Sequence, residues 1–84
     1  MHDFHLADSI YRAIIKEAEI RNIKKITKAV IEIGSIVEHG EEVLPENLDF
    51  NIKMLAENGI ADNLELDIMR TIGDSWILKE IEGE

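Results

Sequence analysis

The sequence predicts an α+β two-layer sandwich, in which two helices cover a mixed three-stranded sheet in the order α-β-α-β-β. Two stretches place apolar residues at helical spacing, and three others place them at every second position. The length of 84 residues suffices for one hydrophobic core, so we expect residues 1–84 to form a single domain. The strand–helix–strand unit requires a right-handed parallel crossover, whereas the last strand is expected to be antiparallel to its neighbour.

The first helix is expected from about residue 3 to residue 20. Its apolar residues follow the i, i+3, i+4 spacing of one face, and Asn22 offers a C-terminal stop. The second helix is expected to begin at Pro45, because the fixed φ and missing N–H of proline suit a first helical turn. Asn58-Gly59 is expected to end it, and residues 35–44 are expected to form a surface loop.

Alternating apolar residues predict the strands. The buried side of the first strand is expected to carry Thr27, Ala29, Ile31 and Ile33. A second alternation runs from Leu64 to Met69, and the last strand is expected to run from Trp76 to Glu82. Because the turn-like Gly73-Asp74-Ser75 separates these two runs, we expect them to form a hairpin, with Trp76 in the core or on an edge strand.

Composition excludes several classes of function. Nine Lys and Arg against eighteen Asp and Glu give a net charge of −9, which opposes nonspecific binding to nucleic acid or to an anionic membrane and favours a basic partner. The lack of cysteine excludes disulfides, zinc–thiolate sites and cysteine nucleophiles. No signal peptide, membrane span, P-loop or GxGxxG motif is recognisable, so we expect a cytoplasmic protein that is not an enzyme.

The N-terminus is the best candidate for metal chemistry. His2 follows the α-amine, so amine, main-chain amide and imidazole nitrogens can close adjacent chelate rings, a donor set that favours Ni(II) or Cu(II). Asp3 could add a carboxylate oxygen, and His5 could reach the same ion or merely cover the helix start. Without further context, a histidine at position 2 is usually a terminal residue without a role, which is the alternative for His2. His39 lies among Glu38, Glu41 and Glu42, a cluster that either binds metal or is solvated surface.

Several segments together resemble a known family. The segments are Met1-His2-Asp3, Leu6-Ala7-Asp8-Ser9-Ile10, Ile26-Thr27-Lys28-Ala29-Val30-Ile31-Glu32-Ile33-Gly34, Leu44-Pro45-Glu46-Asn47-Leu48-Asp49-Phe50, Leu64-Glu65-Leu66-Asp67-Ile68 and Lys79-Glu80-Ile81-Glu82. In this order they are similar to the HypA/HybF family of nickel-incorporation proteins for [NiFe]-hydrogenase maturation. The resemblance covers nearly the whole chain.

The resemblance implies a nickel metallochaperone in which His2, the terminal amine and main-chain nitrogens bind Ni(II), with Asp3 in place of the family's usual Glu. It also implies a HypB-like GTPase and a hydrogenase large subunit, or a similar nickel enzyme, as partners. Family members carry a zinc domain with two Cys-x-x-Cys pairs between the last two strands, whereas residues 70–75 simply turn this chain, so no structural zinc is expected. Two alternatives are a metal-free interaction module with the same fold and a homodimer formed through an open sheet face or edge.

Overall fold

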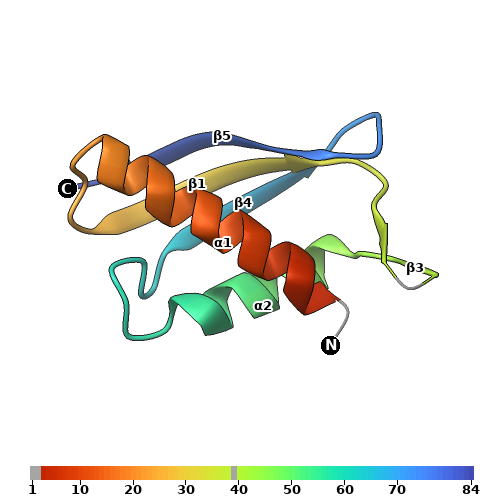
Figure 1. The fold of residues 1–84 in the computed structure, drawn as a ribbon, viewed down its shortest axis with the longest axis horizontal. Coiled ribbons are helices and arrows are strands. Elements are labelled where there is room, and N and C mark those ends of the chain that lie inside the picture. Colours follow the sequence, from red (N-terminus) through yellow and green to blue (C-terminus); the bar gives the residue numbers. More distant parts are fainter. Residues whose placement is uncertain (1–2, 39) are drawn as a thin grey trace.

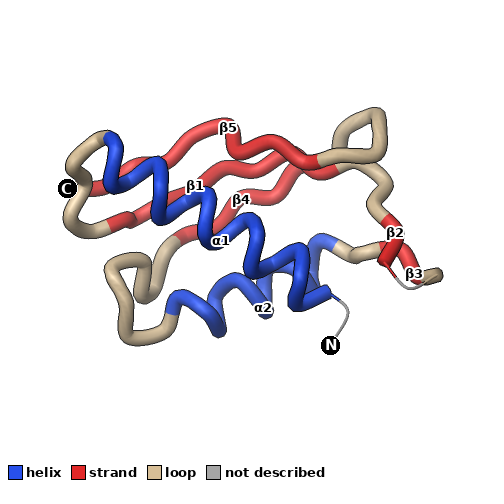
Figure 2. The backbone as a smooth tube through the Cα atoms, in the orientation of Figure 1, coloured by secondary structure: helices blue, strands red, loops and turns tan. Residues whose placement is uncertain are grey.

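The computed structural model describes residues 3–38 and 40–84 and has two layers, with both helices on one face of a three-stranded sheet (Figures 1 and 2). The elements are α1 (Asp3–Ile20), β1 (Ile26–Ile33), β2 (Val37–Glu38), β3 (Glu41–Glu42), α2 (Pro45–Ala56), β4 (Glu65–Arg70) and β5 (Trp76–Gly83). The predicted fold class and the order of the two helices and three main strands are confirmed.

The central strand of the sheet is β1. It pairs in parallel with β4 and antiparallel with β5, so the predicted mixed sheet is confirmed. The predicted hairpin between the last two strands is wrong, because β1 lies between them. The connection over residues 71–75 instead crosses the end of β1, where the N–H of Gly34 donates to the carbonyl of Ser75 over 2.8 Å and the N–H of Thr71 donates to the carbonyl of Ile33 over 3.0 Å. Pairing on both sides satisfies the backbone of the most buried strand.

The core lies between the sheet and the helices. Ala29, Ile31 and Ile33 of β1 are completely buried, as the alternation predicts. They share the core with buried residues of both helices, which include Ile10, Ile14, Leu48 and Ile52. Thr27 was expected on the buried side but is exposed, because an irregularity in the β1–β5 register between Ile26 and Lys28 gives the buried position to Ile26.

The C-terminal end of α1 and the start of α2 follow from local chemistry. At the end of α1, Asn22 adopts a φ of 57°. The N–H of Ile23 donates to the carbonyl of Ala18, and that of Asn22 donates to the carbonyl of Glu19, which together form a Schellman motif. Pro45 begins α2, as predicted.

Two further segments can be compared with the prediction. The segment expected as a loop over residues 35–44 contains the small β2–β3 hairpin, whose base is closed by a 2.8 Å hydrogen bond from the N–H of Val43 to the carbonyl of Ile36. Trp76 begins the edge strand β5 and packs, partly buried, against the core, as predicted. Among the described residues, no helix combines the length and the apolar character needed to cross a lipid bilayer.

Candidate metal centre

The predicted ligand His2 lies outside the described residues. Helix α1 begins at the next residue, Asp3, whose side chain is likewise outside the described part. The helix is anchored close to this end, because Leu6 is 7% exposed and Ala7 and Ile10 are completely buried. The backbone directly after His2 therefore belongs to a helix that is held by the core within its first two turns.

The other two histidines occupy different positions. His5 lies in the first turn of α1 and is exposed, while His39 lies outside the described residues. The flanking Glu38 and Glu41 are described through their backbones, which pair in the β2–β3 hairpin. Figure 1 places this hairpin and the start of α1 toward the same end of the molecule.

Glu42 of the hairpin has a partner that sequence reasoning missed. A nitrogen of the Arg70 guanidinium donates to the Glu42 carboxylate over 2.8 Å, and this pair connects β3 to the end of β4. The two residues are 28 positions apart, so no sequence periodicity links them. Since Arg70 holds this carboxylate, a metal ion at Glu42 would have to displace an existing ion pair.

Among the side chains that the structure describes, no group of three or more from His, Asp or Glu is placed to hold a metal ion. In the sequence, the predicted ligand His2 directly precedes the first residue of α1.

Comparison with known proteins identifies relatives over most of the chain. The model of the family described as "HypA: Hydrogenase/urease nickel incorporation, metallochaperone" matches residues 1–76. The hydrogenase maturation factor HypA of Methanobrevibacter smithii is 34% identical over 68 residues, which are 81% of this chain and 51% of that protein. HypA of Thermococcus onnurineus is 28% identical over an alignment of 91 positions, gaps included, which covers 99% of this chain and 63% of that protein.

The fold has a counterpart among solved structures. The solution structure of the nickel metallochaperone HypA from Helicobacter pylori superimposes with a TM-score of 0.77, covers 98% of this chain and 97% of that chain, and shares 14% sequence identity. This likeness shows the common fold. The chain spans only about half to two thirds of the length of the curated relatives named above. With a family match over residues 1–76, the chain belongs to the HypA family.

Proposed function

We propose that this protein binds Ni(II) at its N-terminus and delivers it during the maturation of [NiFe]-hydrogenase or a similar nickel enzyme. The observation that carries the proposal is the family match, which begins at residue 1 and therefore includes His2. The names of its relatives, hydrogenase maturation factor HypA and nickel metallochaperone HypA, support the same role.

The proposed ligands are the terminal amine, main-chain nitrogens and the His2 imidazole. Nitrogen donors in a roughly square array suit Ni(II), and a terminal amine and an imidazole both release protons to a metal near neutral pH. Asp3 contributes a carboxylate to the ion or orients the terminal segment. The anchored start of α1 supports this assignment, because it gives the short terminal segment a fixed base.

We further propose that residues 1–84 act as one nickel-binding unit without a structural zinc module. The direct connection from β4 to β5 over residues 71–75 and the lack of cysteine in the sequence support this proposal. The unit acts in the cytoplasm as a carrier and not as an enzyme. Its partners are a HypB-like GTPase and the hydrogenase large subunit, or another nickel enzyme.

Calorimetric titration of the untagged protein with Ni(II) tests the proposed site. His2→Ala is expected to weaken binding at least about 100-fold, because even residues that only orient a metal ligand contribute about 10–100-fold to affinity. His5→Ala is the matched control, since it removes an exposed imidazole one helical turn away and is expected to leave the affinity within about twofold. Unchanged affinity in His2→Ala would exclude the site.

A tag on the N-terminus offers a second test. It converts the terminal amine into an amide, so tagged protein is expected to lose Ni(II) binding and to regain it after cleavage that restores Met1. Strong binding by the tagged protein would contradict a role for the amine. Should untagged protein bind no Ni(II) at neutral pH, the metal-free interaction module becomes the preferred function.

A further inference from the structure

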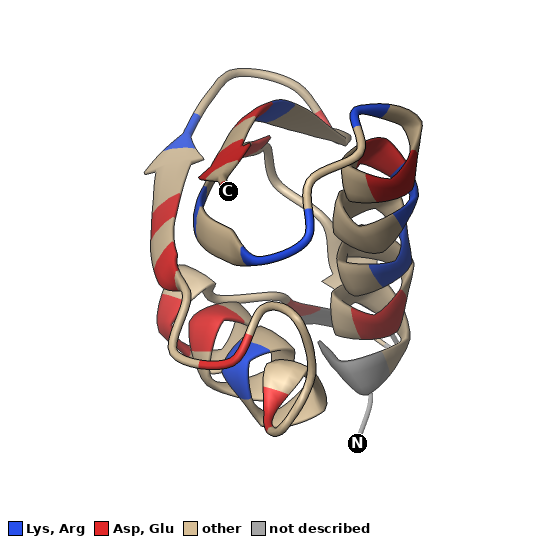
Figure 3. Ribbon diagram, turned by 90° about the vertical axis from the view of Figure 1, so that its left-hand side faces the viewer, with Lys and Arg blue, Asp and Glu red and all other residues tan. Residues whose placement is uncertain are grey.

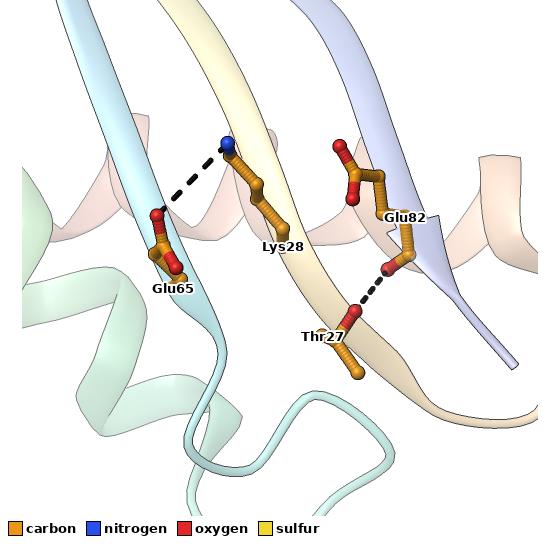
Figure 4. A network of polar contacts seen from close by, with 4 residues as sticks. All are labelled: Thr27, Lys28, Glu65 and Glu82. Carbon is orange, nitrogen blue, oxygen red and sulfur yellow. Dashed lines mark hydrogen bonds and ion pairs between the residues drawn. The ribbon is translucent and has the colours of Figure 1, made fainter.

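The face of the sheet that turns away from the helices carries a charged surface. Alternation places Lys28, Val30 and Glu32 of β1 on this outer face, opposite the buried Ala29, Ile31 and Ile33. Residues directly paired across strands share a face. The outer face therefore also carries Glu65, Asp67 and Met69 of β4 and Ile77, Glu80 and Glu82 of β5. Figure 4 shows Glu65, Lys28 and Glu82 side by side on it.

The outer face is strongly acidic once its ion pairs are considered. Lys79 belongs to it because its Nζ lies 3.9 Å from the carboxylate of Glu32, and the Nζ of Lys28 lies 3.9 Å from that of Glu65. Both lysines are thus shared with acidic neighbours. The other three carboxylates of this face belong to Asp67, Glu80 and Glu82. They form no ion pair among the described residues. Five acids and two bases leave a net charge of −3 on the outer face.

This charge is not spread evenly over the molecule. The segment from Asp8 to Arg21, which forms most of α1 and its end, carries three acidic and three basic residues. Figure 3 shows both signs along this helix. The outer face, with a net charge of −3, is therefore more acidic than the segment from Asp8 to Arg21, whose charges cancel.

One end of the outer face is apolar. Met69 and Ile77 pair with Glu32 from opposite sides and are 41% and 54% exposed. Ile72, in the connection that follows β4, is 99% exposed. Met69 and Ile77 on the face, with Ile72 in the connection that crosses the same end of β1, give this end of the sheet exposed apolar side chains next to an acidic area, the composition of a protein-binding surface.

We propose that the outer face of the sheet binds a basic, amphipathic surface of another protein, with Lys or Arg facing Asp67, Glu80 and Glu82 and an apolar side chain against Met69, Ile72 and Ile77. Charge complementarity selects this partner. A second copy of the chain would bring two acidic faces together, and nucleic acid or an anionic membrane would be repelled. The proposal is independent of nickel, so it can fail or succeed separately from the proposed function.

Titration of ¹⁵N-labelled apo-protein with a helical peptide of Lys and Leu, with Leu on one face, tests the surface. The triple variant Asp67→Asn, Glu80→Gln, Glu82→Gln is compared with the control triple Glu19→Gln, Glu46→Gln, Glu57→Gln, whose residues are exposed on or next to the helices. Both triples reduce the net charge from −9 to −6. We expect the outer-face triple to weaken binding about tenfold and the control less than about twofold, because close ion pairs depend on position.

A second pair of variants tests the apolar end. Ile77→Ser is expected to weaken peptide binding about threefold or more, whereas Ile20→Ser, at a 67% exposed position at the end of α1, should have little effect. Amide shifts should change mainly in β1, β4 and β5. Equal weakening by the two triples, or shifts confined to the helices, would overturn the proposal. A dimer in sedimentation equilibrium that dissociates in the outer-face triple would also overturn it, by assigning the face to a second copy.

Discussion

The two faces of the three-stranded sheet differ in burial and in charge. Toward the helices, β1 presents four completely buried apolar side chains, and Leu66, Ile68 and Leu78 from the flanking strands pack partly buried against the same core. Away from the helices, the strands present carboxylates, lysines and partly exposed apolar side chains. Because neighbouring residues of a strand point to opposite faces, residues that stabilise the core alternate along each strand with residues of the proposed binding surface.

The largest expected effect is on the inner face. Ile31→Ala in β1 removes three methyl or methylene groups from a completely buried position and is expected to lower the free energy of unfolding by about 2–5 kcal/mol. Because small domains are stable by only about 5–15 kcal/mol, the variant should be close to unfolding at 37 °C. Urea denaturation measures the change.

Ile77→Ala makes the same chemical change on the outer face and is the matched control. Ile77 is 54% exposed and lies in the neighbouring strand β5, so its truncation is expected to cost less than about 1 kcal/mol. Equal destabilisation by the two substitutions would contradict the division of roles between the faces.

The next largest loss of stability is expected at the end of β1, where Gly34 lies against the connection over residues 71–75. A Cβ at Gly34 would overlap the carbonyl group of Gly73, which is backbone and cannot rotate away. Gly34→Ala is therefore expected to destabilise the protein by about 1–3 kcal/mol, the usual cost of overpacking. Hydrogen exchange should locate the disturbance in the amides of Ser35 and Thr71, which donate to Gly73 and Ile33. Wild-type stability and exchange would show that the close approach is not required.

A smaller effect is expected where the chain passes from the helix layer to the sheet. Asn22 has a φ of 57°, in the left-handed region that strains most residues with a Cβ but that Asn and Gly tolerate. Asn22→Ala should cost about 1–2 kcal/mol, whereas Asn22→Gly should be neutral to within a few tenths, because glycine adopts this conformation without strain. Thermal unfolding of the two variants side by side measures the difference. Two variants of equal stability would contradict this account of the turn.

The smallest effect is expected from the ion pairs of the outer face. Glu65→Gln breaks the contact with Lys28, which spans 3.9 Å with the Glu65 side chain 74% exposed. The change in unfolding free energy should stay below about 0.5 kcal/mol and should shrink with added salt. A loss comparable with that of Ile31→Ala would show that outer-face charges stabilise the fold, contrary to the comparison.

Much of this fold could be predicted because local patterns agree with the tertiary structure. The spacing of apolar residues in α1 and the alternation in β1 report on burial that the structure largely confirms, and Pro45 marks the start of α2. The hairpin between the last two strands was predicted incorrectly, because turn-like residues between two strands do not reveal that a third strand lies between them. Thr27 was misplaced because a register irregularity is a property of two paired strands.

The candidate site shows the same limit. The donors at His2 and Asp3 could be proposed from the sequence, because adjacent nitrogens form chelate rings without any tertiary contact. The pairing of Arg70 with Glu42 could not, since it joins two elements far apart in the chain. The acidic outer face was equally hidden, because its residues come from three strands.

The sequence by itself determined the types of the main elements, the buried positions of Ala29, Ile31 and Ile33 in β1 and the residue types available at the N-terminus, because each of these depends on residues close together in the chain. The tertiary structure decided the strand order β4-β1-β5, the tight contact of Gly34 with Gly73 and the assembly of one acidic face from scattered carboxylates. These depend on which strands become neighbours, and that choice is made by packing and backbone pairing between distant segments.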